Sequence, residues 1–401
     1  MENPSCNNPL ASYWLLDPGI TFLNHGSFGA CPVPVLEKQQ QLRFQLERQP
    51  LKFFIRDYEQ MHYAAKKKLA DFVNAPEDDI VFVPNVTHGV NTVLKSLTFD
   101  KGEEILTTSH EYPANRNALD FLAKRTGVRI VVVSFNFPLR SKEEVIDAIL
   151  SEVTPRTRLA LVDHVTSPTG LVLPVEEITR EMEKRGVDVM IDGAHALGML
   201  PLDIESLGAA YYSANAHKWL CSPKGSAFLY VKPERQKEIH PLAISHAAVS
   251  STDNPRSLFQ CEFFWTGTND PTACLCIPEA IRFMGSLLPG GWTELMERNR
   301  KVALEAREVL CNMLDIPKPC PDEMIGTLCS VPIPAGIKQL TPPFPHNYIE
   351  PLQDQLYNEF RIEVPVMYWP EFPQRVIRTA TQIYNIPEQY EYLAQVLKKI
   401  L

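Results

Sequence analysis

The run Val187-Asp188-Val189-Met190-Ile191-Asp192, followed by Gly193-Ala194-His195, is the stretch that decides the fold of this chain. Apolar side chains fill it almost continuously, which is typical of a strand buried on both faces of a parallel sheet. The run ends in a carboxylate, Asp192, which is followed at once by a glycine. Such a sheet binds its ligands at the carboxyl ends of its strands, so Asp192 stands where a site is expected.

Strand and helix patterns alternate around this run, from residue 80 to residue 231. Short β-rich runs predict strands at residues 80–83, 104–107, 129–134, 159–163, 187–192, 209–213 and 226–231. Amphipathic stretches predict helices at residues 86–97, 114–124, 142–152 and 175–184. This order predicts the α/β class, with a mostly parallel sheet that is covered by helices.

The pattern changes after residue 261. Helices are predicted at residues 293–313, 348–360 and 387–401, a strand at 375–379, and an irregular, proline-rich connection at 317–339. We therefore expect an N-terminal arm (residues 1–20), a large domain (residues 21–285) and a small C-terminal α+β domain (residues 286–401).

Composition excludes several classes of protein. The 401 residues carry a net charge of −9, with acidic and basic residues interleaved, so neither a nucleic-acid surface nor a membrane-binding segment is expected. The first residues lack the pattern of a signal peptide, and the nine cysteines include no CxxC pair. No metal site is therefore expected, and a reducing cytoplasm fits best. Phosphate loops of the GxGxxG and GxxxxGK[ST] types do not occur, which argues against a nucleotide-binding protein.

Lys218 follows the predicted strand at 209–213, within Ser213-Ala214-Asn215-Ala216-His217-Lys218-Trp219. A lysine between a histidine and a tryptophan is a poor candidate for a solvated surface residue. Together with Asp192 it matches the needs of pyridoxal 5′-phosphate (PLP): the amine forms a Schiff base with the aldehyde, and the carboxylate keeps the pyridine nitrogen protonated. Taken alone, the aspartate could be a helix cap and the lysine a surface residue.

Other predicted strand ends carry polar or aromatic side chains that suit the same cofactor. Thr87 begins a predicted helix, where free N–H groups and a hydroxyl can bind phosphate, although a threonine there is often only a cap. Asn215 and His217 are spaced to offer further donors to a phosphate. Tyr112 can stack on a flat ring, and Ser167 can reach the cofactor's phenolic oxygen, although both lie in ordinary turn sequences.

The chain resembles the fold-type I PLP enzymes of the class V aminotransferase superfamily, and most closely their isopenicillin N epimerase-like group. The resemblance rests on Phe22-Leu23-Asn24-His25-Gly26-Ser27-Phe28-Gly29 and Asp192-Gly193-Ala194-His195, and runs from about residue 21 to residue 378. It implies that Lys218 forms the Schiff base, Asp192 contacts the pyridinium nitrogen, His195 lies near the phenolic oxygen and Tyr112 stacks on the ring. Val86 is a further implied cofactor contact, and the implied phosphate contacts are Thr87, His88, Asn215 and His217, completed in a homodimer by Thr266, Gly267 and Thr268 of the second subunit.

The resemblance also implies a binding site for an amino-acid substrate. Arg378 matches the arginine that receives the substrate α-carboxylate, and a planar guanidinium suits that role. Arg375 is its rival, and a surface arginine is the plain alternative. Asn24, His25 and Gly26 are expected near the substrate. Residues 364–374 contain no cysteine, which argues against a cysteine desulfurase, and Ser167 replaces the asparagine of many relatives.

The predicted chemistry begins when Lys218 removes the Cα proton of the substrate. Epimerisation at Cα is favoured, with Tyr112 or a residue of the His25 segment as a second acid. A cysteine or cystine C–S lyase is the close alternative, and an aminotransferase is less favoured. Outside the enzymes, the chain could be a catalytically silent scaffold that binds PLP, although it would then not need Lys218, Asp192 and Arg378 together.

Overall fold

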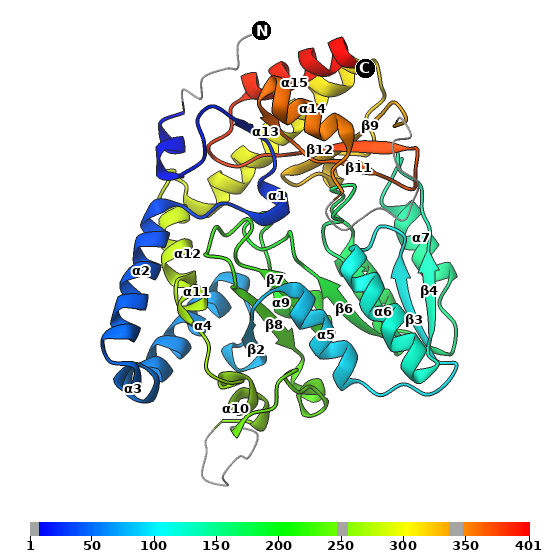
Figure 1. Cartoon of the computed structure of the whole chain (residues 1–401). Helices are drawn as coiled ribbons and strands as arrows, with labels where there is room; N and C mark the ends of the chain where they lie inside the picture. The colour runs from blue at the N-terminus through cyan, green and yellow to red at the C-terminus, as the bar shows by residue number, and fades with distance from the viewer. Residues whose placement is uncertain (1–7, 247–255, 337–347) are drawn as a thin grey trace.

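The computed structural model describes residues 8–246, 256–336 and 348–401. A seven-stranded sheet lies at its centre (Figure 1). Its strand order is β2-β8-β7-β6-β5-β3-β4. Only β8 runs antiparallel to its neighbours. The strands are β2 (Ile80–Val83), β3 (Glu104–Thr108), β4 (Arg129–Val133), β5 (Thr157–Asp163), β6 (Asp188–Asp192), β7 (Tyr211–Asn215) and β8 (Ala227–Val231). The prediction of a mostly parallel sheet is confirmed.

Two helical layers cover this sheet, and the alternation of side chains along each strand explains why. On β6, Met190 packs into the cluster formed with α5 (Val86–Ser96) and α6 (Pro113–Thr126). Its neighbours Val189 and Ile191 pack on the other face, with α7 (Glu143–Ser151) and α8 (Val175–Glu183). Successive strand side chains point to opposite faces, so a strand buried on both sides must be apolar throughout.

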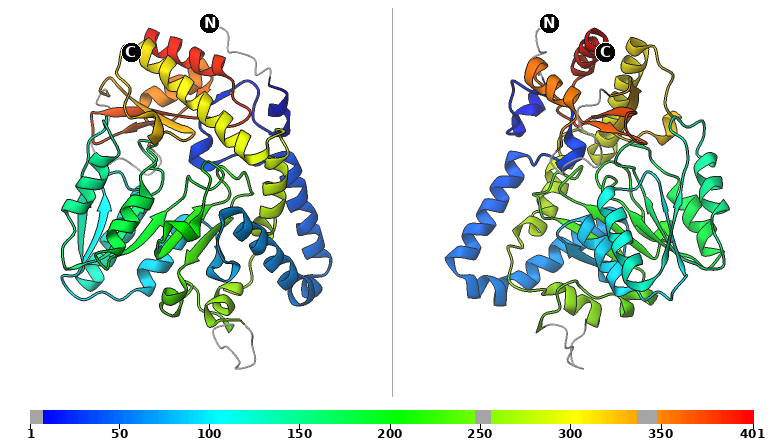
Figure 2. Two further views of the ribbon diagram at one scale, coloured as in Figure 1. Left: turned by 180° about the vertical axis from the view of Figure 1, so that it is seen from behind. Right: turned by 45° about the vertical axis from the view of Figure 1, so that its right-hand side comes forward.

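A three-stranded antiparallel sheet, in the order β11-β12-β9, lies beyond the carboxyl ends of the large sheet (Figure 1). Its strands are β9 (Leu328–Ile333), β11 (Val366–Tyr368) and β12 (Arg375–Ala380), and α13 (Gly291–Leu314), α14 (Pro351–Phe360) and α15 (Pro387–Ile400) accompany them. The long α13 packs against α15 (Figure 2). The prediction of an irregular segment at 317–339 was wrong where β9 lies. Pro332 is tolerated there because β9 is an edge strand.

The N-terminal segment forms a third, two-stranded parallel sheet with a segment near the C-terminus. β1 (Thr21–Phe22) pairs with β10 (Ile362–Glu363), and α1 (His25–Phe28) follows directly. The remaining helices are α2 (Val33–Arg48), α3 (Pro50–Lys52), α4 (Tyr58–Val73), α9 (Ile204–Leu207), α10 (Leu258–Phe264), α11 (Thr272–Leu275) and α12 (Ile277–Gly285). The division into an arm and two domains stays a prediction. No helix of the described ranges is both long and apolar enough to cross a membrane.

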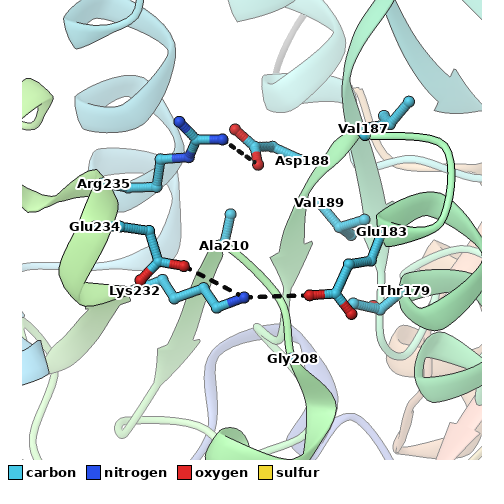
Figure 3. A pocket seen from close by; sticks show the side chains of 11 residues that line it. Thr179, Glu183, Val187, Asp188, Val189, Gly208, Ala210, Lys232, Glu234 and Arg235 are labelled. Atoms are coloured by element: carbon cyan, nitrogen blue, oxygen red, sulfur yellow. Dashed lines mark hydrogen bonds and ion pairs between the residues drawn. The ribbon is translucent and has the colours of Figure 1, made fainter.

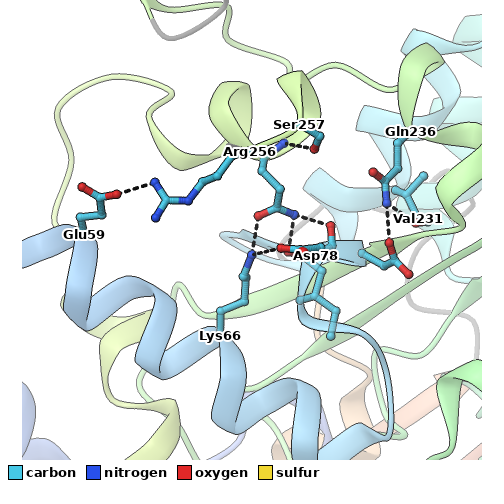
Figure 4. A network of polar contacts seen from close by, with 10 residues as sticks. Glu59, Lys66, Asp78, Val231, Gln236, Arg256 and Ser257 are labelled. Carbon is cyan, nitrogen blue, oxygen red and sulfur yellow. Dashed lines mark hydrogen bonds and ion pairs between the residues drawn. The ribbon is translucent and has the colours of Figure 1, made fainter. Parts of the chain in front are cut away.

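A buried polar network fixes α4 and α10 to the start of β2 (Figure 4). The Lys66 ammonium on α4 donates a hydrogen bond to the side-chain oxygen of Gln260 on α10. The amide nitrogen of Gln260 donates in turn to the backbone oxygens of Asp78, at 2.6 Å, and Ile80, at 3.2 Å. Burial lowers the pKa of Lys66 to about 8. The network holds the sheet edge and lines no part of the cavity described below.

Candidate active site

A cavity of about 330 Å³ lies at the carboxyl ends of β5, β6 and β7. The last residues of these strands, Asp163, Asp192 and Asn215, all line it, together with Lys218. The carboxyl ends of neighbouring parallel strands meet at one edge, which is why these residues come together. The predicted site residues that line the cavity are Val86, Thr87, Tyr112, Ser167, Asp192, His195, Asn215, His217 and Lys218.

A second cavity, of about 220 Å³, lies at the other end of β6 and has a different character (Figure 3). Its charges pair with one another: Arg235 with Asp188 at 2.9 Å, and Lys232 with Glu183 and Glu234 at 3.4 Å each. Charges that neutralise one another at the surface leave little to attract a ligand. The cavity at the carboxyl ends is therefore the candidate active site.

Lys218 lies in the candidate active site with its amine beside a histidine. The Nζ atom is 3.1 Å from Nε2 of His195. Burial, aided by the positive charge of Arg378, lowers the pKa of the Lys218 amine to about 7, although Asp192 and Asp163 oppose this shift. An amine with a pKa of about 7 is about half unprotonated at neutral pH, and its unprotonated form can act as a nucleophile and then as a base.

Asp192 is buried beneath the cavity and is held by two donors. Asn115 donates to its Oδ2 atom at 2.6 Å, and the backbone N–H of Ala194 donates to Oδ1 at 2.9 Å. Burial raises the pKa of the Asp192 carboxyl, whereas these two hydrogen bonds and the Lys218 charge lower it. Asn115, from the first turn of α6, was missed in the sequence, because nothing there shows which face of the helix meets β6.

The start of α5 offers hydrogen-bond donors at the cavity. Asn85 caps the helix by accepting from the His88 N–H at 2.9 Å, and Asn215 accepts from the Val86 N–H at 3.0 Å. Within the described residues, the Thr87 N–H and hydroxyl have no partner and are free for an anion. His217 is also present, with Nδ1 3.2 Å from the Ser226 oxygen, and burial lowers its pKa to about 4. The His88 side chain does not line the cavity.

Gly89 explains how α5 comes so close to the sheet. A Cβ atom at this position would lie 2.4 Å from Oγ of Ser213 on β7, so any side chain would push the helix away. The glycine thereby lets the first turn of α5, with Thr87, border the cavity.

Arg378 is buried next to the cavity and is held by two serines that line it. One terminal nitrogen, Nη1, donates to the backbone oxygen of Ser167 and to its Oγ at 3.2 Å; Nη2 donates to Oγ of Ser27 at 3.1 Å. Its Nε has no partner in the described parts of the chain. Burial lowers its pKa to about 10, so the group stays positive at neutral pH. The rival Arg375 is occupied by Glu350, 2.6 Å away.

The three predicted substrate residues of the N-terminal segment do not line the cavity. His25 is fully buried, with Nδ1 2.7 Å from the Tyr384 hydroxyl and Nε2 3.1 Å from the Lys218 oxygen, and burial lowers its pKa to about 3. Asn24 bridges Ser27 and Glu363. Gly26 packs so closely on Leu328 that a Cβ would lie 2.7 Å from it.

Two neighbours of these residues, Ser27 and Phe28, do line the cavity and were missed in the sequence. Thr266, Gly267 and Thr268 lie outside the cavity of their own chain, and Thr268 is exposed. Their role in the phosphate site of a second subunit stays a prediction, as do the substrate roles of Asn24, His25 and Gly26.

The side chains of the cavity fit PLP in their chemistry. Lys218 supplies an amine for the aldehyde, and Asp192 supplies a buried carboxylate for the pyridine nitrogen. Thr87 supplies unpartnered donors for the phosphate, near the imidazole of His217 and the amide of Asn215. Tyr112, at the cavity mouth and 44% exposed, supplies an aromatic face.

Comparison with known proteins agrees with this fit. The aminotransferase class-V family model matches residues 47–334. Isopenicillin N epimerase of Amycolatopsis lactamdurans is 32% identical, with 96% of each chain covered. L-cysteine desulfhydrase of Arabidopsis thaliana is 27% identical, with 96% of this chain and 88% of the relative covered.

Solved structures share the fold. A complex of the cystine C–S lyase C-DES with its product cysteine persulfide has a TM-score of 0.79 at 22% identity, with 94% of this chain and 97% of that chain covered. Another C-DES structure, with glycine covalently linked to the PLP cofactor, gives the same score and identity, with 94% and 96% covered. The chain thus belongs to the aminotransferase class-V family, and its predicted fold-type I architecture and PLP cofactor are confirmed.

Proposed function

We propose that this PLP-dependent enzyme removes the Cα proton of an amino-acid substrate with Lys218 as the base. The observation that carries the proposal is the Lys218 amine, 3.1 Å from His195, in one cavity with the buried carboxylate of Asp192. The bound cofactor supplies an electron sink for the pair left on Cα. The pKa of about 7 makes Lys218 a competent base at neutral pH.

Arg378 suits the α-carboxylate of the substrate. Its guanidinium is buried, positive at neutral pH and held in place by Ser27 and Ser167 at the edge of the cavity. A planar fork orients a carboxylate through paired hydrogen bonds, which would present Cα to Lys218. Thr87, Asn215 and His217 are assigned to the phosphate, and Tyr112 to the face of the ring.

Epimerisation is the proposed outcome, because besides the Lys218 amine the cavity holds the Tyr112 hydroxyl, which could return a proton. The Tyr112 side chain lines the cavity from the β3–α6 connection, whereas Lys218 enters from the segment after β7. His25 is a poorer second acid, since both of its ring nitrogens face other partners. The most similar relative named above is an epimerase.

Elimination from a cysteine-type substrate is the second candidate. The cavity of about 330 Å³ is near the lower end of ligand pockets, at about 300–1,000 Å³, and must hold the cofactor as well. A compact amino acid such as cysteine fits that space better than a long one. In β-elimination Lys218 removes the Cα proton, the C–S bond breaks and the thiolate leaves. No second acid on the opposite face is then needed.

One experiment separates the two reactions. Wild type, Tyr112→Phe and Lys218→Ala are incubated in D₂O with L-cysteine, L-cystine and other amino acids, and deuterium at Cα, chirality, sulfide and pyruvate are measured. Epimerisation predicts racemised, deuterated substrate that Tyr112→Phe abolishes. Elimination predicts sulfide and pyruvate that Tyr112→Phe largely retains. Lys218→Ala should lose either activity. If wild type binds PLP but turns over none of these amino acids, the chain is a catalytically silent scaffold.

We also propose a homodimer in a reducing, cytoplasmic compartment. Phe28 is 76% and Ile55 72% exposed, and exposed apolar side chains on α1 and the α3–α4 connection suit a subunit interface. The described cysteines are free thiols, which suits a reducing compartment. Sedimentation of the purified protein tests the dimer. Activity recovered on mixing Lys218→Ala with a Thr266→Ala/Thr268→Ala variant would support shared sites.

A further inference from the structure

Asp163 is a buried carboxyl group of the cavity to which the roles above give no task. It ends β5 and is the Cα partner of Asp192, which ends β6. Its side chain is only 4% exposed and lines the cavity. Two aspartates therefore stand side by side at the end of the site where the ring nitrogen is expected.

The two carboxyl groups differ in their partners. Asp192 accepts one hydrogen bond on each oxygen, from Asn115 and from the Ala194 N–H. Asp163, within the described ranges, accepts only from its own backbone N–H. Donors stabilise a carboxylate, and two neighbouring buried carboxylates resist being ionised together. The negative charge therefore belongs on Asp192, and a proton on Asp163.

The charges that face Asp163 agree with this division. Burial, followed by repulsion from Asp192 and Glu111, raises the pKa of the Asp163 carboxyl well above its usual range, and Lys218 opposes the shift. Glu111 itself is buried, with its pKa raised to about 7 mainly by burial. The charged groups in the next layer are Arg116 and Asp120 behind Glu111, and Arg378 beyond Lys218.

We propose that Asp163 is a further cofactor-binding residue, an uncharged carboxylic acid next to the Asp192 carboxylate that donates a hydrogen bond to the phenolic oxygen of the PLP ring. The inference rests on the proposed function, since it takes the Lys218 cavity as the PLP site. Asp192 supplies the charge that keeps the ring nitrogen protonated. Asp163 adds a donor to the ring without placing a second negative charge beside Asp192.

Infrared spectroscopy of the full-length apo protein tests the proton. Spectra are recorded above neutral pH in a Glu111→Gln background, so that Glu111 adds no acid band. We expect the carbonyl band of a carboxylic acid, which should disappear in Asp163→Asn. The band should persist in the control Asp188→Asn, because Asp188 begins β6, at the end opposite Asp192. A missing band, or one that is lost in Asp192→Asn but kept in Asp163→Asn, overturns the proposal.

The affinity for PLP tests the contact. Asp163→Asn keeps an uncharged donor and should bind PLP within about threefold of wild type, whereas Asp163→Leu should bind about tenfold more weakly, as for one lost hydrogen bond. Asp163→Ala replaces the leucine variant if that fails to fold. Equal affinity of the apolar variant and wild type overturns the contact. Absence of PLP binding in wild type with an intact infrared band overturns the proposed function and the contact, but not the protonation.

Discussion

The Nζ atom of Lys218 lies 3.1 Å from Nε2 of His195, and Nε1 of Trp219 donates to Nδ1 of the same ring at 3.4 Å. Burial and nearby cations lower the pKa of His195 well below its usual value, so the ring is neutral. A neutral imidazole carries one N–H, and the tryptophan assigns it to Nε2, facing Lys218. Only an unprotonated amine can accept that hydrogen, so the arrangement favours neutral Lys218.

The rate at which the apo protein captures PLP should therefore rise with pH through about 7 and level off above it. The unprotonated amine attacks the aldehyde, and its fraction saturates about two units above the pKa. Stopped-flow absorbance of the bound cofactor measures this rate. A rate that keeps climbing towards the usual lysine pKa of about 10.4 would contradict the buried, neutral amine.

Trp219→Phe should move the midpoint of that profile to higher pH, by up to about one unit. Without the indole donor, the His195 ring can place its proton on Nδ1 and accept from the Lys218 ammonium instead. The matched control is Trp292→Phe, which loses an indole hydrogen bond to the Ile281 oxygen outside the cavity. The control should leave the midpoint unchanged. The same shift in both variants would refute the tautomer argument.

Asn115→Ala should lower kcat about tenfold or more while PLP remains bound. The amide donates to Asp192 at 2.6 Å, and a hydrogen bond to a charged group contributes about 1.5–3 kcal/mol. Loss of this hydrogen bond raises the pKa of Asp192. The carboxylate then competes with the ring nitrogen for the proton that the nitrogen should carry. Turnover and PLP content are measured together. The control is Asn117→Ala, an exposed amide on α6, which should change neither quantity.

Strand ends were the part of the site that could be predicted from the sequence. Asp192 ends an apolar run, and Thr87, Asn215 and Lys218 closely follow predicted strands. The parallel order of the sheet then brings all of them to one edge, whatever the details of packing. Prediction failed where a proline-rich segment hid a strand, because β9 gains its order from pairing with β12.

Contacts that depend on register or on distant pairing could not be predicted. Asp163 joins the site because β5 and β6 align residue for residue, and the sequence does not state that alignment. Ser27 reaches Arg378 because β1 pairs with β10, which is more than 300 residues away in the chain. His25 is conspicuous in its motif, yet it faces Tyr384 and the Lys218 backbone.

Gly89→Ala should weaken PLP binding by about tenfold and lower the free energy of unfolding by about 1–3 kcal/mol. The added Cβ would lie 2.4 Å from Ser213 Oγ, so the first turn of α5 must shift together with Thr87. PLP affinity and urea unfolding are measured. Adding Ser213→Ala removes the nearest atom and should restore part of both losses; a single variant that matches wild type would refute the close-packing argument.

Replacing Lys218 should stabilise the apo protein most at low pH. The pKa of the amine is about 7 when folded and about 10.4 when unfolded, so between these values the unfolded chain binds more protons and the stability of wild type rises with pH. Lys218→Met carries no such proton. Its free energy of unfolding should exceed that of wild type by at most about 5 kcal/mol below pH 7, with the difference closing towards pH 10. Urea unfolding across this range measures the difference, with Lys101→Met at an exposed position as control. If the free energies of unfolding of wild type and Lys218→Met changed with pH in parallel, the Lys218 amine would have the same pKa in the folded and unfolded states. Lys218 would then lack the lowered pKa on which its role as the base depends.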